Sequence, residues 1–214
     1  MAQILKFPAP AAKLGYKRVR RRASPSQDPD QLQLFPQPTA QILEFSSALS
    51  VFGRALLLDE RGDPRAAELY RKAIEEGDCV ADAYCNLGIL ESQKGNIAKA
   101  FDCFTLSLKA DPRHAEAHFN LGNLYLDAHD LRLAQLHYEL AGEVDPSFAN
   151  VHYNLALLHA IRNDLPAATK AVTTYKQLVP EQEGRKADEL LQGLRKKLDA
   201  RRDPPRHRSG GAPE

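Results

Sequence analysis

The spacing of apolar positions is the most informative property of this sequence. From about residue 46 to residue 182, apolar residues recur three and four positions apart, which is the spacing of one face of an amphipathic helix. The pattern returns every 34 residues, and each repeat holds two short helical stretches separated by a turn. The sequence therefore predicts a row of helix hairpins.

Residues of like kind at this spacing indicate how each hairpin closes. Gly88, Gly122 and Ala156 are small enough to let two helices cross closely, and a large side chain of the second helix fills the space beside the crossing. A proline after the second helix stops it. The repeating series are Leu87, Leu121 and Leu155; Ala66, Ala100, Ala134 and Ala168; Tyr70, Phe104, Tyr138 and Val172; and Pro112, Pro146 and Pro180.

This pattern resembles the tetratricopeptide repeat (TPR), whose signature W-x2-L-G-x2-Y…A-x3-F…P runs over 34 residues. The best match contains His118, Leu121, Gly122, Tyr125, Ala134, Tyr138 and Pro146 in that order. The expected units are about 46–80, 81–114, 115–148 and 149–182, and the first has a turn one residue longer than the others. The resemblance implies an all-α, right-handed α-solenoid of about four TPR helix hairpins, whose first helices line a concave surface.

The segments that flank the repeats have a different character. Residues 183–202 place Leu190, Leu191, Leu194 and Leu198 on one helical face, which predicts a C-terminal capping helix over the last hairpin. Residues 1–38 are rich in proline, are basic and lack sustained periodicity, so we expect a disordered arm, and 203–214 a disordered tail. A leading helix is expected from near Thr39.

Charge is distributed unevenly along the 214 residues, although the net charge is only +1. Residues 1–40 hold seven Lys or Arg against two Asp, whereas residues 41–184 hold thirteen basic against twenty-one acidic residues. No apolar run is long enough to span a bilayer, and we expect a cytoplasmic protein with no membrane partner. The Arg-rich, acid-free start also fits an organellar transit peptide, although its prolines interrupt a long helix.

Six of the seven histidines lie between residues 114 and 159, which raises the question of a metal site. His118 and His152 occupy the Trp position of the TPR signature, so inter-helix packing is the simpler reading. The spacing His114-Ala-Glu-Ala-His118 also differs from the zincin motif H-E-x-x-H. We therefore expect no metal and no cofactor. The three cysteines lack CxxC spacing, which favours reduced core or groove residues.

Motifs for catalysis or phosphate binding are missing from the sequence: it contains no P-loop, no dinucleotide-binding glycine motif and no nucleophile elbow. We therefore expect a protein that is not an enzyme and has no small-molecule substrate. Its expected function is that of a scaffold or adaptor, which binds a protein or an extended peptide in the concave TPR groove.

Asparagines at the 34-residue spacing are the main candidates for that binding. Asn86, Asn120 and Asn154 precede the Leu-Gly or Leu-Ala pairs, and an amide side chain can both donate to and accept from a peptide backbone. We call these three residues the asparagine ladder. A purely structural role remains the alternative, since Asn is also a common polar residue of the repeat. Further candidates for the groove are Cys85, Phe119, Tyr153 and Asn123, and packing between units is the alternative for the first three.

The acidic first helices favour a basic or neutral peptide. The basic run "KRVRRR" gives a second possible function, because such a run can bind nucleic acid through its phosphates. The protein would then be a nucleic-acid-associated or regulatory accessory protein. The run can equally be a solvated arm or fold back on the chain's own acidic middle. Its basic residues are Lys17, Arg18, Arg20, Arg21 and Arg22.

Overall fold

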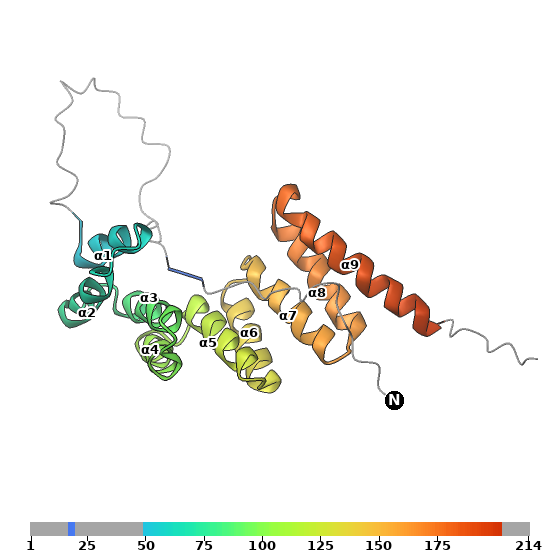
Figure 1. Cartoon of the computed structure of the whole chain (residues 1–214), viewed down its shortest axis with the longest axis horizontal. Coiled ribbons are helices and arrows are strands. Elements are labelled where there is room, and N and C mark those ends of the chain that lie inside the picture. The colour runs from blue at the N-terminus through green and yellow to red at the C-terminus, as the bar shows by residue number, and fades with distance from the viewer. Residues whose placement is uncertain (1–16, 20–48, 203–214) are drawn as a thin grey trace, which may run out of the picture. The chain divides into compact units, whose positions relative to one another are not determined.

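The computed structural model describes residues 17–19 and 49–202, apart from the side chains of 186 and 195–202. Within these ranges all regular structure is α-helical (Figure 1). The remainder of the expected arm, the leading helix from Thr39 and the tail 203–214 lie outside the described residues. The helices are α1 (Val51–Glu60), α2 (Ala66–Glu76), α3 (Val80–Gln93), α4 (Ile97–Ala110), α5 (Ala115–Asp127), α6 (Leu131–Val144), α7 (Ala149–Ile161), α8 (Leu165–Leu178) and α9 (Glu181–Arg202).

The helices pair in chain order into four hairpins, α1 with α2, α3 with α4, α5 with α6, and α7 with α8. The chain divides into two compact units. The amino-terminal unit spans residues 18–112 and holds the first two hairpins, and the carboxy-terminal unit holds the other two, α9 and Lys17. The prediction of an all-α fold built from helix hairpins is confirmed.

The hairpins α3–α4 and α5–α6 are each closed by a near-contact between a glycine and an aromatic ring. A Cβ atom added to Gly122 would lie 2.6 Å from Cδ1 and Cε1 of Tyr138, and one added to Gly88 would lie 2.7 Å from Cε1 of Phe104. Both rings are fully buried. Glycine at these positions is therefore required by the space between the helices.

The turns inside the hairpins also follow the 34-residue spacing. Gly95, His129 and Asn163 all have a positive φ, of 80°, 62° and 64°. The residue after each of them precedes the second helix, and Asp130 and Asp164 cap that helix by accepting hydrogen bonds from backbone N–H groups. His129 is therefore a turn residue.

Helix α9 packs on α8 and covers the end of the last hairpin. Its buried side chains Ala187, Leu190, Leu191 and Leu194 join the core formed by α7 and α8. An end hairpin without such a cover would expose an apolar face to water. The predicted capping helix is confirmed, and it begins at Glu181.

Two of the clustered histidines pack against each other in the carboxy-terminal unit. His118 of α5 and His137 of α6 have ring centroids 5.3 Å apart, and their Nδ1 atoms are separated by 3.1 Å. Tyr125 stacks on His137 with its centroid at 5.4 Å. Burial, with a smaller contribution from His118, lowers the pKa of His137 to about 4.

We expect Gly122→Ala to lower the free energy of unfolding by about 1–3 kcal/mol, because the added methyl group overpacks the Tyr138 ring. Urea denaturation measures the loss. Gly193→Ala in α9 is the matched control, since its Cβ would meet no atom within 4 Å and alanine favours a helix. Equal effects of the two substitutions would contradict the close crossing.

Stability should fall as the pH drops from about 6.5 toward 4. The folded pKa of His137 is below its unfolded value, so the unfolded chain binds the extra proton more readily in this interval. Thermal melts at pH 7.5 and pH 4.5 should show a smaller difference for His137→Gln than for the wild type. His129→Gln, in an exposed turn, is the control and should keep the wild-type difference.

Candidate peptide-binding site

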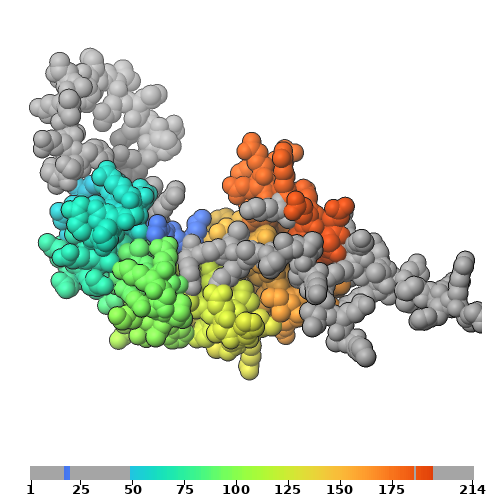
Figure 2. All heavy atoms as spheres, viewed as in Figure 1, coloured from blue at the N-terminus to red at the C-terminus, as the bar shows by residue number. Residues whose placement is uncertain are grey.

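A short piece of the chain itself lies on two of the ladder asparagines. In the amino-terminal unit, the backbone N–H of Val19 donates to Oδ1 of Asn86 at 2.9 Å, and Nδ2 of Asn86 donates to the carbonyl oxygen of Val19 at 3.1 Å. One amide side chain therefore satisfies both backbone groups of one residue. Figure 2 shows the segment 17–19 in blue against the helices that hold it.

The carboxy-terminal unit repeats this arrangement with the same geometry. Lys17 N–H donates to Oδ1 of Asn120 at 2.9 Å, and Nδ2 of Asn120 donates to the carbonyl oxygen of Lys17 at 3.1 Å. Each asparagine thus pairs with both backbone groups of one residue.

Buried polar groups behind Asn86 hold its amide in place. Nδ2 of Asn86 lies 3.3 Å from the Tyr70 hydroxyl oxygen, and that hydroxyl donates to Oδ2 of Asp59 at 3.0 Å. The two Nδ2 protons therefore go to Val19 and Tyr70, while Oδ1 accepts from Val19. All three side chains of this network, Asp59, Tyr70 and Asn86, are at least 96% buried. A fixed amide binds a backbone without first losing rotamer freedom.

Side chains of the bound segment make their own contacts in the amino-terminal unit. Val19 is only 1% exposed. Arg18 Nη2 lies 3.0 Å from Oδ1 of Asp59 and 3.4 Å from Oε1 of Gln93. Burial raises the pKa of Asp59, and Arg18 and Tyr70 oppose that rise. Burial likewise raises the pKa of Tyr70, which keeps its hydroxyl protonated as a donor.

Lys17 extends over a mixed surface of the carboxy-terminal unit. Its Nζ lies 5.8 Å from the centroid of the Phe148 ring, within the range of a cation–π interaction. The cavity at this place has a volume of about 310 Å³, and its lining includes the acidic residues Glu116, Asp145 and Glu183. Aromatic and acidic groups together favour a basic side chain here.

Asn154 and Asn123 belong to an internal network of the carboxy-terminal unit. Tyr138 OH donates to Oδ1 of Asn123 at 2.7 Å, and Nδ2 of Asn154 donates to the same oxygen at 2.8 Å. A similar network joins Asp59, Tyr70 and Asn86 two hairpins earlier in the chain. Both of its asparagines are fully buried.

The three apolar candidates lie in the cores of the units. Phe119 packs between the rings of Tyr138 and Phe148, with centroids at 5.8 and 4.9 Å. Tyr153 packs against Tyr175 at 5.1 Å, and Cys85 is fully buried in α3. Packing explains all three positions in this structure, and their contact with a peptide stays a prediction.

The basic run is described only at Lys17 and Arg18, because Arg20, Arg21 and Arg22 lie outside the described residues. The guanidinium of Arg18 forms an ion pair with Asp59, an acid of the chain's own repeats. Of the three possibilities for the run, folding back is the one that these two residues adopt.

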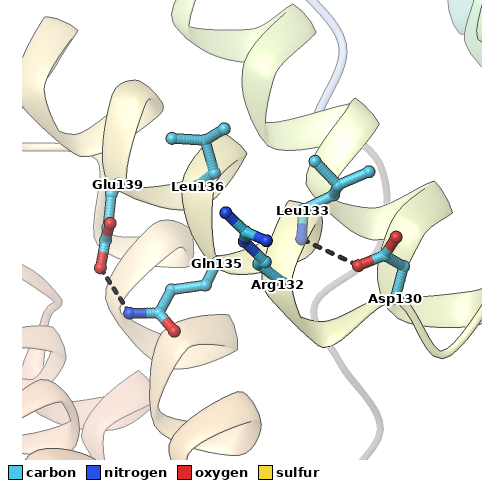
Figure 3. A pocket seen from close by; sticks show the side chains of 6 residues that line it. All are labelled: Asp130, Arg132, Leu133, Gln135, Leu136 and Glu139. Atoms are coloured by element: carbon cyan, nitrogen blue, oxygen red, sulfur yellow. Dashed lines mark hydrogen bonds between the residues drawn. The ribbon is translucent and has the colours of Figure 1, made fainter.

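A larger hollow, of about 570 Å³, lies along α6 and the turn before it, lined by Asp130, Arg132, Leu133, Gln135, Leu136 and Glu139 (Figure 3). All of its lining side chains come from a single helix and its cap. Gln135 and Glu139 are hydrogen-bonded to each other at 2.7 Å along this surface. The hollow is a helix surface rather than an enclosed site.

Among the described side chains, no group of three His, Cys, Asp or Glu is placed to hold a metal ion. Cys79, Cys85 and Cys103 form no disulfide with one another. None of the described helices is long and apolar enough to cross a bilayer.

Sequence reasoning missed Asp59, Tyr70 and Val19 as site residues. Asp59 gave a usable signal, because it is an acid at the end of the apolar run "ALLL" and at the helical spacing of Ala55. The repeat pattern assigns Tyr70 to packing alone, since periodicity reports the ring and not the partner of the hydroxyl. Val19 gave no signal, because its contact with Asn86 spans 67 residues of sequence.

Comparison with known proteins agrees with this architecture. Two family profiles, both described as tetratricopeptide repeat, match residues 81–114 and 103–136. No curated protein sequence shows significant similarity to the chain.

Solved structures resemble the fold at low sequence identity. The structure titled first TPR of Spaghetti (RPAP3) bound to HSP90 peptide SRMEEVD is 20% identical with a TM-score of 0.52, and the match covers 56% of this chain and 93% of that one. The crystal structure of MamA is 16% identical with a TM-score of 0.52, covering 72% and 98%. The MamA RS-1 ArsTM double mutant is 19% identical with the same TM-score, covering 72% and 94%.

Sequence identities this low support a similarity of fold alone, whereas the two profiles match the sequence of the repeat itself. The 34-residue period, the glycine crossings and the paired helices agree with both. Residues 81–136 therefore carry tetratricopeptide repeats, and the helix hairpins of the described residues have the fold of that repeat.

Proposed function

We propose that this protein is an interaction module that binds extended stretches of a partner protein, through the amide of Asn86 in the amino-terminal unit and the amide of Asn120 in the carboxy-terminal unit. The observation that carries the proposal is the paired hydrogen bonding of both asparagines to the backbone of residues 17–19. Such pairing grips any extended backbone, because every residue except proline offers the same N–H and C=O groups. TPR domains generally act as interaction modules, which favours binding over catalysis.

Charge supports a basic or neutral partner. The acid beside Asn86 is the buried Asp59, and acidic residues line the cavity beside Lys17. The peptide named in the Spaghetti structure, SRMEEVD, is acidic on balance. A peptide of that charge would place carboxylates near Asp59, so we expect the partner of this chain to differ from it in charge.

Asn154 would make a third, weaker contact with the partner. Its place in the repeat equals that of Asn86 and Asn120, but its Nδ2 already donates to Asn123. A partner would have to share this amide with the internal network. The main binding energy should therefore come from the other two asparagines.

Replacing Asn86 and Asn120 by Ala should weaken peptide binding by about tenfold or more for each asparagine, because each substitution removes two hydrogen bonds to the peptide backbone. Peptides selected on the wild-type chain from a displayed library, then titrated by fluorescence anisotropy, provide the measurement. Helical content by circular dichroism should stay at the wild-type level.

Gln135→Ala is the matched control, since it removes an amide from the outer surface of α6. It should leave the affinity unchanged. Selected peptides that bind the double asparagine variant as tightly as the wild type would rule out the amide clamp.

A further inference from the structure

We infer that the Asn86 site selects peptides in which an arginine is followed directly by a small apolar residue, and that the chain's own Arg18-Val19 is the resident ligand that a partner must displace. This inference rests on the proposed function. It adds which side chains are read beside the backbone and what occupies the site before a partner arrives.

Asp59 supplies the selectivity for arginine. Its carboxylate is 4% exposed, sits near the C-terminal end of α1 and is held by the Tyr70 hydroxyl, so it is in position before any ligand binds. The guanidinium of Arg18 reaches this carboxylate while the next residue pairs with Asn86. A long cationic side chain one position before the clamped residue is therefore the chemistry that fits.

Val19 supplies the second requirement. Its exposed fraction of 1% shows that the clamped residue is enclosed, while its N–H and C=O are both taken by Asn86. A charged side chain at this position would lose its hydration. Proline there would lack the N–H that Asn86 accepts. A small apolar residue satisfies both conditions.

The resident segment is held in a manner that allows exchange. Nε of Arg18 is buried without a hydrogen-bond partner among the described residues, and the carboxylate of Asp59 loses its hydration in the ion pair. A partner arginine whose flanking residues satisfy that Nε would bind more favourably. The site is therefore protected by a ligand that a better peptide can replace.

The segment that connects Val19 with the first helix is long enough for the resident ligand to come from the same chain. Residues 20–48 connect Val19 with Leu49, and 29 residues can reach at most about 100 Å. A tethered ligand meets its site at an effective concentration on the order of millimolar. A peptide from another molecule must compete with that concentration, which sets a threshold against weak partners.

The test uses full-length chains and a labelled peptide of residues 14–22, LGYKRVRRR. Fluorescence anisotropy should show that Val19→Asp binds this peptide at least about tenfold more tightly than the wild type, because the substituted segment no longer competes. Arg18→Glu is a second opened variant and should behave alike if Val19→Asp misfolds. Circular dichroism checks the helices of both.

Selectivity for arginine is measured in the opened variants, Val19→Asp and Arg18→Glu. A peptide with alanine in place of the arginine that matches Arg18 should bind about tenfold more weakly, and Asp59→Asn should abolish that difference. A scrambled peptide of the same composition controls for net charge and should bind weakly throughout. Equal binding of the arginine and alanine peptides would overturn the selectivity.

Two further outcomes would overturn the resident ligand. One is equal peptide affinity of the wild type and both opened variants. The other is a wild-type dimer in sedimentation analysis that the opened variants do not form, which would place the segment on a second copy. Failure of the proposed function is separable, because it would appear as unchanged peptide binding when Asn86→Ala and Asn120→Ala are added to an opened variant.

Discussion

The close crossing of the two helices in the hairpins α3–α4 and α5–α6 is the constraint on which the rest of the structure depends. Glycine at 88 and 122 brings the second helix so near that its aromatic ring lies directly against the first helix. The ring fills the space between the two helices, and this packing fixes the position of the outer end of the side chain. Where that ring is tyrosine, as at Tyr138, a hydroxyl is carried to the asparagines of the first helices. Packing and polar organisation therefore have one origin.

Buried polarity follows from this geometry and decides what the protein can bind. A buried hydroxyl or amide without a partner is unfavourable, so Tyr70 and Tyr138 each enter a network with an asparagine of the following hairpin. In the amino-terminal unit the network ends in Asp59, a charged group, and Arg18 of the bound segment forms an ion pair with it. In the carboxy-terminal unit the corresponding network ends in Asn123, a neutral group. The network behind Asn86 thus ends in a charged group, whereas the network behind Asn154 ends in a neutral one.

The clamp explains how a repeat protein can hold its own chain at positions that composition marks as unstructured. Residues 17–19 contain nothing that predicts a fixed conformation, and their order comes from groups 67 and 103 positions away. Each of the two amides takes both backbone groups of one residue. The bound segment needs no helix or sheet of its own.

Sequence by itself determined the helix hairpins, their period and their capping helix. These features depend on residues three, four and 34 positions apart, and residues at fixed spacings can be compared directly in the sequence. It also singled out Asn86 and Asn120, since a polar residue recurring at a fixed place in an apolar repeat is visible without coordinates. Only the tertiary structure decided that Asp59 and Tyr70 stand behind Asn86, and that Arg18 and Val19 lie on them. Hydrogen bonds and ion pairs between distant segments leave no periodic trace, so the partner of a buried polar group is known only when the chain is folded.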